Sequence, residues 1–189
     1  MKSKIDNQKT PGTKYNVRYI QSFPINLPAT QIDLYKWITE MTEQDYTSYS
    51  PAHLAMNSYV KDAVLFMTNV ENVSTDTVVQ HYEMKYHSQS HVQFYSAKSE
   101  AFVMRWFRVL VGVPWEMQIR ELPGNTCELV CLVGADYPNL FLKAASWFAG
   151  LGGLFLKRHL VKEGREFARH IQEKFSLNKQ VNFKFHTAE

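Results

Sequence analysis

The chain has 189 residues and a formal net charge of +3, with 45% hydrophobic and 21% charged residues. These values are typical of one compact domain that can bury a core, and they exclude a disordered or fibrous protein. Lys and Arg are spread along the chain, which argues against a nucleic-acid partner. The polar residues 1–13 lack the apolar core of a signal peptide, so we expect a disordered tail on a cytoplasmic protein.

The N-terminal part is predicted to form one strand and two short helices. Residues 14–23 alternate in the manner of a strand, and prolines follow them. Two pairs spaced like capping boxes come next, Thr30 with Asp33 and Thr42 with Asp45. They predict two short helices, which end near residue 41 and before residue 51.

Six apolar or alternating runs follow, with turn residues between them. Their spacing of about ten residues predicts an antiparallel meander and not βαβ units. The runs are residues 63–70, 77–86, 91–97, 101–111, 114–122 and 127–134. In the fifth, Trp115, Met117 and Ile119 alternate with polar residues. We expect these three side chains to face inward and to line a ligand pocket.

After residue 134 the apolar pattern changes to a helical period. Residues 156, 160, 167, 171 and 175 recur at helical spacing and predict a long helix with one apolar face. Residues 138–156 approach the length of a membrane span, but three glycines interrupt them, so membrane contact is not expected. Residues 177–189 are predicted to be a loosely held tail. Cys127 and Cys131 lie four apart in one strand, too far for a disulfide, and are expected to be buried free thiols.

This order of elements resembles the helix-grip fold of the START and Bet v1-like (SRPBCC) superfamily over residues 14–176. The segment Gln21-Ser-Phe-Pro-Ile25 lies where members of that superfamily pass from the first strand into the paired helices. The resemblance implies an α+β domain in which a curved antiparallel sheet of about seven strands surrounds a long C-terminal helix. It also implies a cavity between sheet and helix, used in different members for lipids, polyketides or aromatic substrates. The 12 Phe, 10 Tyr and 4 Trp agree with a pocket for a hydrophobic or aromatic small molecule.

The most specific local feature is the pair His159 and Glu163 on the predicted long helix. Side chains four residues apart share one side of a helix, so an imidazole nitrogen and a carboxylate oxygen can converge on one ion. Zinc accepts such ligands at roughly 2.0–2.2 Å. Glu163 lies within the arc of the apolar stripe, where an unpartnered carboxylate is costly. An exposed His–Glu pair at the edge of the stripe is the alternative.

His53 follows the paired helices in Tyr49-Ser-Pro-Ala-His53-Leu54. Together with His159-x-x-x-Glu163, this segment is similar to the zinc-dependent hydrolases of diacetylphloroglucinol and phloretin, which place two His and two Glu around one zinc. The resemblance implies His53, Glu83, His159 and Glu163 as zinc ligands, with Glu83 chosen by its order along the chain. Strand parity, however, sends Glu83 outward unless a bulge intervenes. The chain is also shorter than typical members and lacks their lid segments.

Two functions remain open from the sequence. One is a zinc-dependent hydrolase that cleaves the carbon–carbon bond between an acyl group and the aromatic ring of a phenolic compound. The other is a metal-free carrier or sensor of a hydrophobic ligand or lipid. Tyr46, Tyr49 and His87 are candidates for proton transfer, and nothing in the sequence selects one. A homodimer is also left open.

Overall fold

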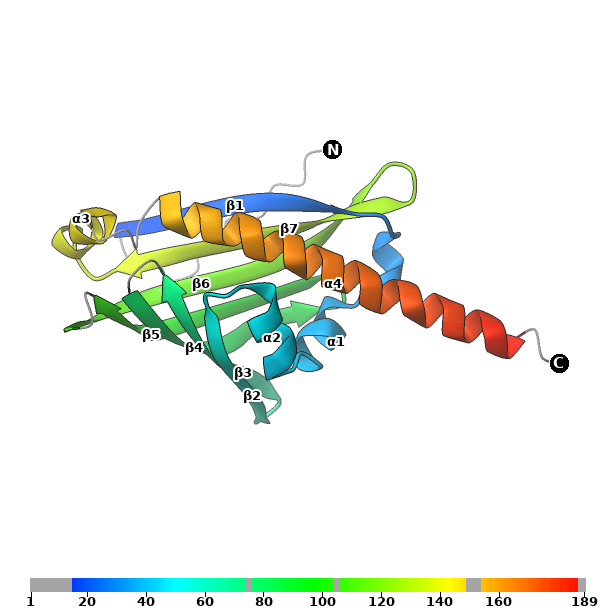
Figure 1. Cartoon of the computed structure of the whole chain (residues 1–189), viewed down its shortest axis with the longest axis horizontal. Helices are drawn as coiled ribbons and strands as arrows, with labels where there is room; N and C mark the ends of the chain where they lie inside the picture. Colours follow the sequence, from blue (N-terminus) through cyan, green and yellow to red (C-terminus); the bar gives the residue numbers. More distant parts are fainter. Residues whose placement is uncertain (1–14, 74–75, 104–105, 149–153, 187–189) are drawn as a thin grey trace.

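The structure, a computed structural model, describes residues 15–73, 76–103, 106–148 and 154–186. Seven antiparallel strands form one curved sheet, and a long helix crosses its inner face (Figure 1). The strands are β1 (Tyr15–Ile25), β2 (His53–Lys61), β3 (Val64–Val73), β4 (Asp76–Ser88), β5 (His91–Val103), β6 (Phe107–Leu122) and β7 (Thr126–Tyr137). The helices are η1 (Ala29–Gln31), α1 (Leu34–Thr39), α2 (Glu43–Tyr49), α3 (Leu140–Phe148) and α4 (Leu154–His186). The spatial order β1-β7-β6-β5-β4-β3-β2 confirms the predicted α+β architecture.

Helix α4 presents the predicted apolar stripe to the sheet. Leu160, Phe167 and Ile171 are all buried. A Cβ atom at Gly164 would lie 2.0 Å from Cε2 of Phe23 on β1, so the lack of a side chain lets the helix approach the sheet closely. The helical backbone continues to His186, past the predicted boundary at residue 177, and this end projects beyond the sheet (Figure 1). Among the described residues, no helix is long and apolar enough to cross a membrane.

The starts of the two short helices follow the sequence only in part. Helix α2 has the predicted capping box: the Thr42 N–H donates to Asp45 Oδ2 at 2.9 Å, and the Asp45 N–H donates to Thr42 Oγ1 at 3.1 Å. The start predicted at Thr30 was wrong. Thr30 lies in the short η1 turn, and Asp33 caps α1 by accepting the Lys36 N–H at 2.8 Å.

The number of strands was predicted correctly, but one strand was missed and one predicted strand does not exist as a separate element. Strand β2 was missed, and the runs 91–97, 101–111 and 114–122 form only two strands, β5 and β6. The pairing register of β5 shifts between Ser96 and Ser99, which breaks the alternation in that strand. Pro114 does not end a strand, because the β6–β7 pairing is interrupted between Gly112 and Trp115, where a residue without an N–H is tolerated.

The inner face of the sheet is packed at one end and hollow at the other. At the packed end, η1 and α1 contact β6, and Ile32, Leu34 and Trp37 are fully buried. Met117 and Ile119 of β6 are buried in this core. Cys127 and Cys131 are also buried and free, as predicted.

Candidate metal centre and cavity

Four ionisable side chains from three elements converge beside the hollow part of the domain. They are His53 at the start of β2, Glu71 on β3, and His159 and Glu163 on α4. One potential ligand atom from each lies within 4.8 Å of all the others. The structure therefore brings together three of the four predicted ligands and adds one, Glu71, that the sequence analysis missed.

The backbone around His53 fixes the direction of its imidazole. The His53 N–H donates to the Ser50 carbonyl at 3.0 Å, which closes the turn between α2 and β2. Its Nδ1 atom donates to the Tyr46 carbonyl at 2.7 Å, and the Tyr46 ring stacks on the imidazole with a centroid separation of 4.0 Å. Because the proton on Nδ1 is used in this bond, Nε2 is directed at the Glu163 carboxylate, which it contacts.

Glu71 is held by a neighbour from a different element. The Tyr46 hydroxyl donates to Glu71 Oε1, while Glu71 Oε2 lies 3.2 Å from His159 Nε2. The same His159 atom lies 2.6 Å from Glu163 Oε1, so the two residues of the helical pair meet as the sequence predicts. The side chains of His159 and Glu163 are 15% and 13% exposed, so this pair is not the exposed alternative.

Glu83 does not reach this cluster. On β4 the buried side chains are those of residues 76, 78, 80, 82 and 84, so residue 83 points to the outer face of the sheet. There it forms an ion pair with Lys85 at 2.6 Å, and its side chain is 44% exposed. The assignment of Glu83 as a metal ligand was therefore wrong, for the reason that strand parity already gave. Glu71, on the inward parity of β3, takes its place.

Of the three candidates for proton transfer, the structure places only Tyr46 at the cluster. Tyr49 forms a hydrogen bond of 2.5 Å with His170, about two turns further along α4, and His87 stacks on Tyr35 with a centroid separation of 4.2 Å. Burial, followed by the nearby Glu71 and Glu163, raises the pKa of Tyr46 well above its usual value. At neutral pH Tyr46 therefore keeps its proton and serves as a hydrogen-bond donor to Glu71.

The charges of the cluster shift its pKa values strongly. Burial disfavours the charged form of His159, but Glu163 and Glu71 outweigh this effect and raise the pKa of His159 to about 10. Burial likewise disfavours the Glu163 carboxylate, but His159 and then His53 outweigh it and hold the pKa of Glu163 well below its usual range. The Glu163 carboxylate is thus stabilised by positive charge on the imidazoles, and any other cation among them would serve the same purpose.

The donor set fits a zinc ion. His53 Nε2 and the Glu163 carboxylate are both acceptors when the imidazole is neutral, so a positive charge, either a proton or a metal ion, has to lie between them. Two imidazole nitrogens and two carboxylate oxygens match the ligand types of zinc, and a divalent cation balances the two carboxylates. The Tyr46 carbonyl and hydroxyl supply the outer hydrogen bonds that usually orient such ligands.

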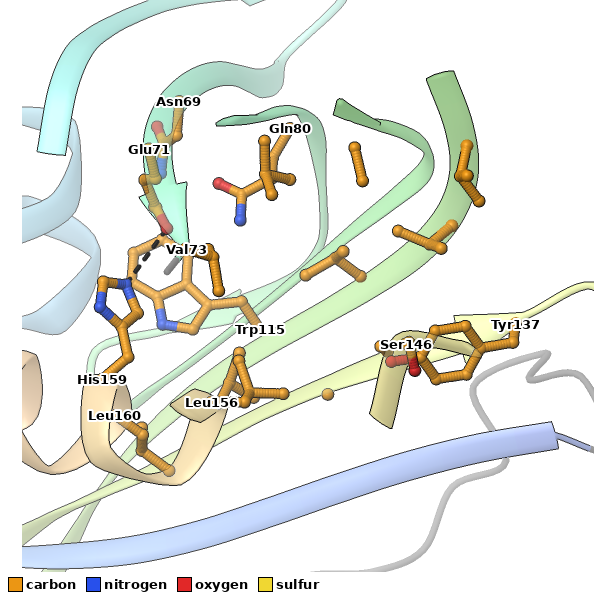
Figure 2. Close-up of a pocket in the computed structure, with 18 of the residues that line it drawn as sticks. Asn69, Glu71, Val73, Gln80, Trp115, Tyr137, Ser146, Leu156, His159 and Leu160 are labelled. Atoms are coloured by element: carbon orange, nitrogen blue, oxygen red, sulfur yellow. Dashed lines mark hydrogen bonds and ion pairs between the residues drawn. The ribbon is translucent and has the colours of Figure 1, made fainter. Parts of the chain in front are cut away.

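The cluster opens on a cavity of about 530 Å³ between the sheet and α4. Figure 2 shows His159 and Glu71 together at one side of this space, with Trp115 beside them. Trp115 thus lines the cavity as predicted, whereas Met117 and Ile119 belong to the packed core and do not line it. The η1 and α1 segments contact β6, the strand that carries those two residues. Phe107 and Phe141, 66% and 77% exposed, line the opposite end.

Stability of the metal-free protein is expected to depend on pH through His159. A pKa raised in the folded state contributes stability that is fully present below the unfolded value of about 6.5. This contribution is lost as the pH rises toward the folded value of about 10. Urea unfolding in the presence of a chelator should therefore show a falling free energy of unfolding across that window. His159→Gln, which cannot titrate, should show a smaller fall. Equal slopes for the two proteins would contradict the pairing.

Comparison with known proteins identifies the fold. No family model matches the chain, and no curated protein matches its sequence. Among solved structures, the chain is similar to the Zhui aromatase/cyclase of Streptomyces sp. R1128, with a TM-score of 0.55, 7% identity, and coverage of 85% of this chain and 94% of that one. It is also similar to major latex-like protein 151 of Panax ginseng, with a TM-score of 0.55, 9% identity, and coverage of 82% and 97%. A START superfamily protein of Mycobacterium smegmatis matches with a TM-score of 0.50, 8% identity, and coverage of 85% and 97%. The chain therefore has the helix-grip fold that the sequence predicted.

Proposed function

We propose that this protein is a zinc-dependent hydrolase that cleaves the carbon–carbon bond between an acyl group and the aromatic ring of a phenolic compound. The observation that carries the proposal is the convergence of two His and two Glu at the wall of an apolar cavity. A cluster of this kind has the ligands of a metal centre, and the cavity next to it has the size and lining of a small-molecule site.

His53, Glu71, His159 and Glu163 would hold the ion. When bound there, zinc would supply a Lewis acid that polarises a carbonyl oxygen and lowers the pKa of nearby water. The hydrolysis breaks the bond between the acyl carbon and the ring carbon. The acyl carbon gains the hydroxyl group of water and leaves as a carboxylic acid, while the ring carbon gains a proton.

The chain's own side chains would orient the substrate for this reaction. Three aromatic residues line the cavity next to the cluster: Tyr82, Trp115 and Phe167. The ring centroids of Tyr82 and Trp115 are 5.8 Å apart, and those of Trp115 and Phe167 are 6.1 Å apart. These rings offer flat apolar surface to an aromatic group and exclude water around it. Tyr46 holds Glu71 in place through its hydroxyl and fixes His53 through its carbonyl.

Two likenesses support the choice of substrate. The segments that carry His53 and the His159–Glu163 pair resemble those of the hydrolases that act on diacetylphloroglucinol and phloretin. One structure with the same fold is an aromatase/cyclase. The fold by itself does not select a reaction, so the proposal rests on the cluster.

A metal-free carrier of a hydrophobic ligand is the second candidate. The apolar cavity favours it, because the cavity is present whether or not an ion is bound. In that case both imidazoles would remain protonated and paired with the carboxylates, as the raised pKa values of His53 and His159 allow.

Metal content and activity separate the two candidates. We expect the purified protein to contain about one zinc ion per chain, as measured by elemental analysis, and to hydrolyse diacetylphloroglucinol or phloretin, as measured by chromatography of the products. A chelator should abolish hydrolysis, and added zinc should restore it. Absence of metal even after incubation with zinc, with ligand binding retained, would leave the carrier.

A further inference from the structure

Two buried amides interrupt the apolar wall of the cavity. Asn69 on β3 and Gln80 on β4 are paired across the two strands and face the same side of the sheet. They are 3% and 7% exposed, and both line the cavity. The side-chain oxygens Oδ1 of Asn69 and Oε1 of Gln80 have no hydrogen-bond partner among the described residues.

Unpaired acceptors of this kind are costly in a purely structural role. Burying a carbonyl oxygen without a donor loses the hydrogen bonds that water would give, and most buried polar groups are therefore paired. An apolar residue of similar size at either position would avoid this loss. Two such oxygens on a cross-strand pair of residues therefore point to a ligand that supplies the missing donors.

The rest of the cavity wall indicates the chemical character of that ligand. Valines at positions 73, 78, 109, 111, 113 and 133 form much of the surrounding wall. Neutral amide oxygens in apolar surroundings favour a neutral donor, such as a hydroxyl group, over a cation, whose burial would be more costly. The aromatic side chains of Tyr82 and Trp115 line the same cavity, so an aromatic ring that carries the hydroxyl group also finds matching surface.

The amides also lie at a useful distance from the proposed metal centre. Asn69 and Glu71 are two residues apart on one strand, so their side chains leave the same face roughly 7 Å apart. One substituted aromatic ring can bridge that distance. Figure 2 shows Asn69, Glu71 and Gln80 on the same side of the cavity.

We propose that Asn69 and Gln80 form a hydroxyl-binding subsite, which selects aromatic ligands that carry a free hydroxyl group. As a statement about the substrate of the enzyme, this inference rests on the proposed function, since the hydroxyl would sit at the amides while the acyl group reaches the cluster. As a statement about binding, it applies to the hydrolase and to the carrier alike.

The test uses two probes of nearly equal shape, 2-naphthol and 2-methylnaphthalene, and measures their affinities by quenching of tryptophan emission. The quantity of interest is the ratio of the two dissociation constants in each protein, because it cancels changes common to both probes. In the double variant Asn69→Leu/Gln80→Met the ratio should shift by up to about tenfold against 2-naphthol, the size expected for the one hydrogen bond that its hydroxyl group can donate to these oxygens. The single variants should each give part of this shift. The control is Val109→Ala, in the apolar wall, which should weaken the binding of both probes and leave the ratio of their dissociation constants unchanged.

Each result bears on the subsite in a definite way. The midpoint temperature of thermal unfolding should be unchanged or higher in the double variant, because the substitutions remove unpaired buried oxygens. A ratio that stays the same in the double variant overturns the subsite. The cation 2-naphthylmethylammonium serves as a third probe. If the double variant lost affinity for this cation but kept its affinity for 2-naphthol, the amides would select positive charge, and the hydroxyl assignment would be overturned. The measurement is made on zinc-loaded and on chelator-treated protein. If zinc failed to bind, the proposed catalysis would be refuted, but the ratio of dissociation constants would still test the subsite.

Discussion

Replacement of His159 by alanine should remove the metal from the protein and with it any hydrolytic activity. His159 Nε2 lies 2.6 Å from Glu163 and 3.2 Å from Glu71, so it is central to the cluster. Loss of an outer hydrogen bond around a metal ligand lowers metal affinity or activity by about 10- to 100-fold, and loss of the ligand itself should exceed roughly 100-fold. Elemental analysis and product chromatography of the variant measure the two effects.

Two further variants make this result specific. His170→Ala removes an imidazole from the same helix outside the cluster and should keep both metal and activity. Glu71→Gln keeps the shape of the side chain but removes its charge, and it should weaken metal binding as well. Circular dichroism should show a folded His159→Ala protein, because the core does not depend on this residue. Stoichiometric zinc in His159→Ala would refute the assignment of the centre.

Truncation of Phe167 to alanine is expected to destabilise the protein by about 3–5 kcal/mol. Its ring is 3% exposed and lies between three others, with centroid separations of 5.0 Å to Tyr49, 5.6 Å to Trp37 and 6.1 Å to Trp115. The change therefore removes contacts from α1, α2, β6 and α4 together. The free energy of unfolding, measured with urea, gives the effect.

The matched control is Lys162→Ala, an exposed position on the same helix, which should change stability by less than about 0.5 kcal/mol. A loss below about 1 kcal/mol for Phe167→Ala would mean that α4 does not depend on its apolar stripe for attachment to the sheet.

The sequence revealed the helical half of the candidate centre and only part of the strand half. His159 and Glu163 follow from the fixed spacing of a helix, and His53 from its place after the paired helices. Glu71 was missed because the predicted strand ended at residue 70, three residues before β3 ends at Val73. Its signal was present: Leu65, Met67, Asn69 and Glu71 share one parity, and all four are buried.

The strand boundaries failed where the pairing is irregular. Alternation predicts the face of a residue only while the register is constant, and β5 contains a shift between Ser96 and Ser99. A second shift, between Met84 and Tyr86 on β4, leaves Tyr86 48% exposed although it shares the parity of the buried Met84. Local patterns do not show such shifts, because they arise from the partner strands. The extent of the cavity was hidden for a similar reason, since η1 and α1 decide which inward side chains are covered.

Because the sheet has a packed end and a hollow end, substitutions at the two ends have different effects. Side chains such as Trp37 and Met117 are surrounded by other core residues, so a change there is paid in stability. Wall residues such as Val109 and Val111 border open space, so a change there removes fewer contacts and alters mainly the shape offered to a ligand. Mutations that broaden or shift ligand preference can therefore accumulate at the hollow end before stability falls below the threshold for folding. Ligand specificity can thus change while the scaffold stays the same.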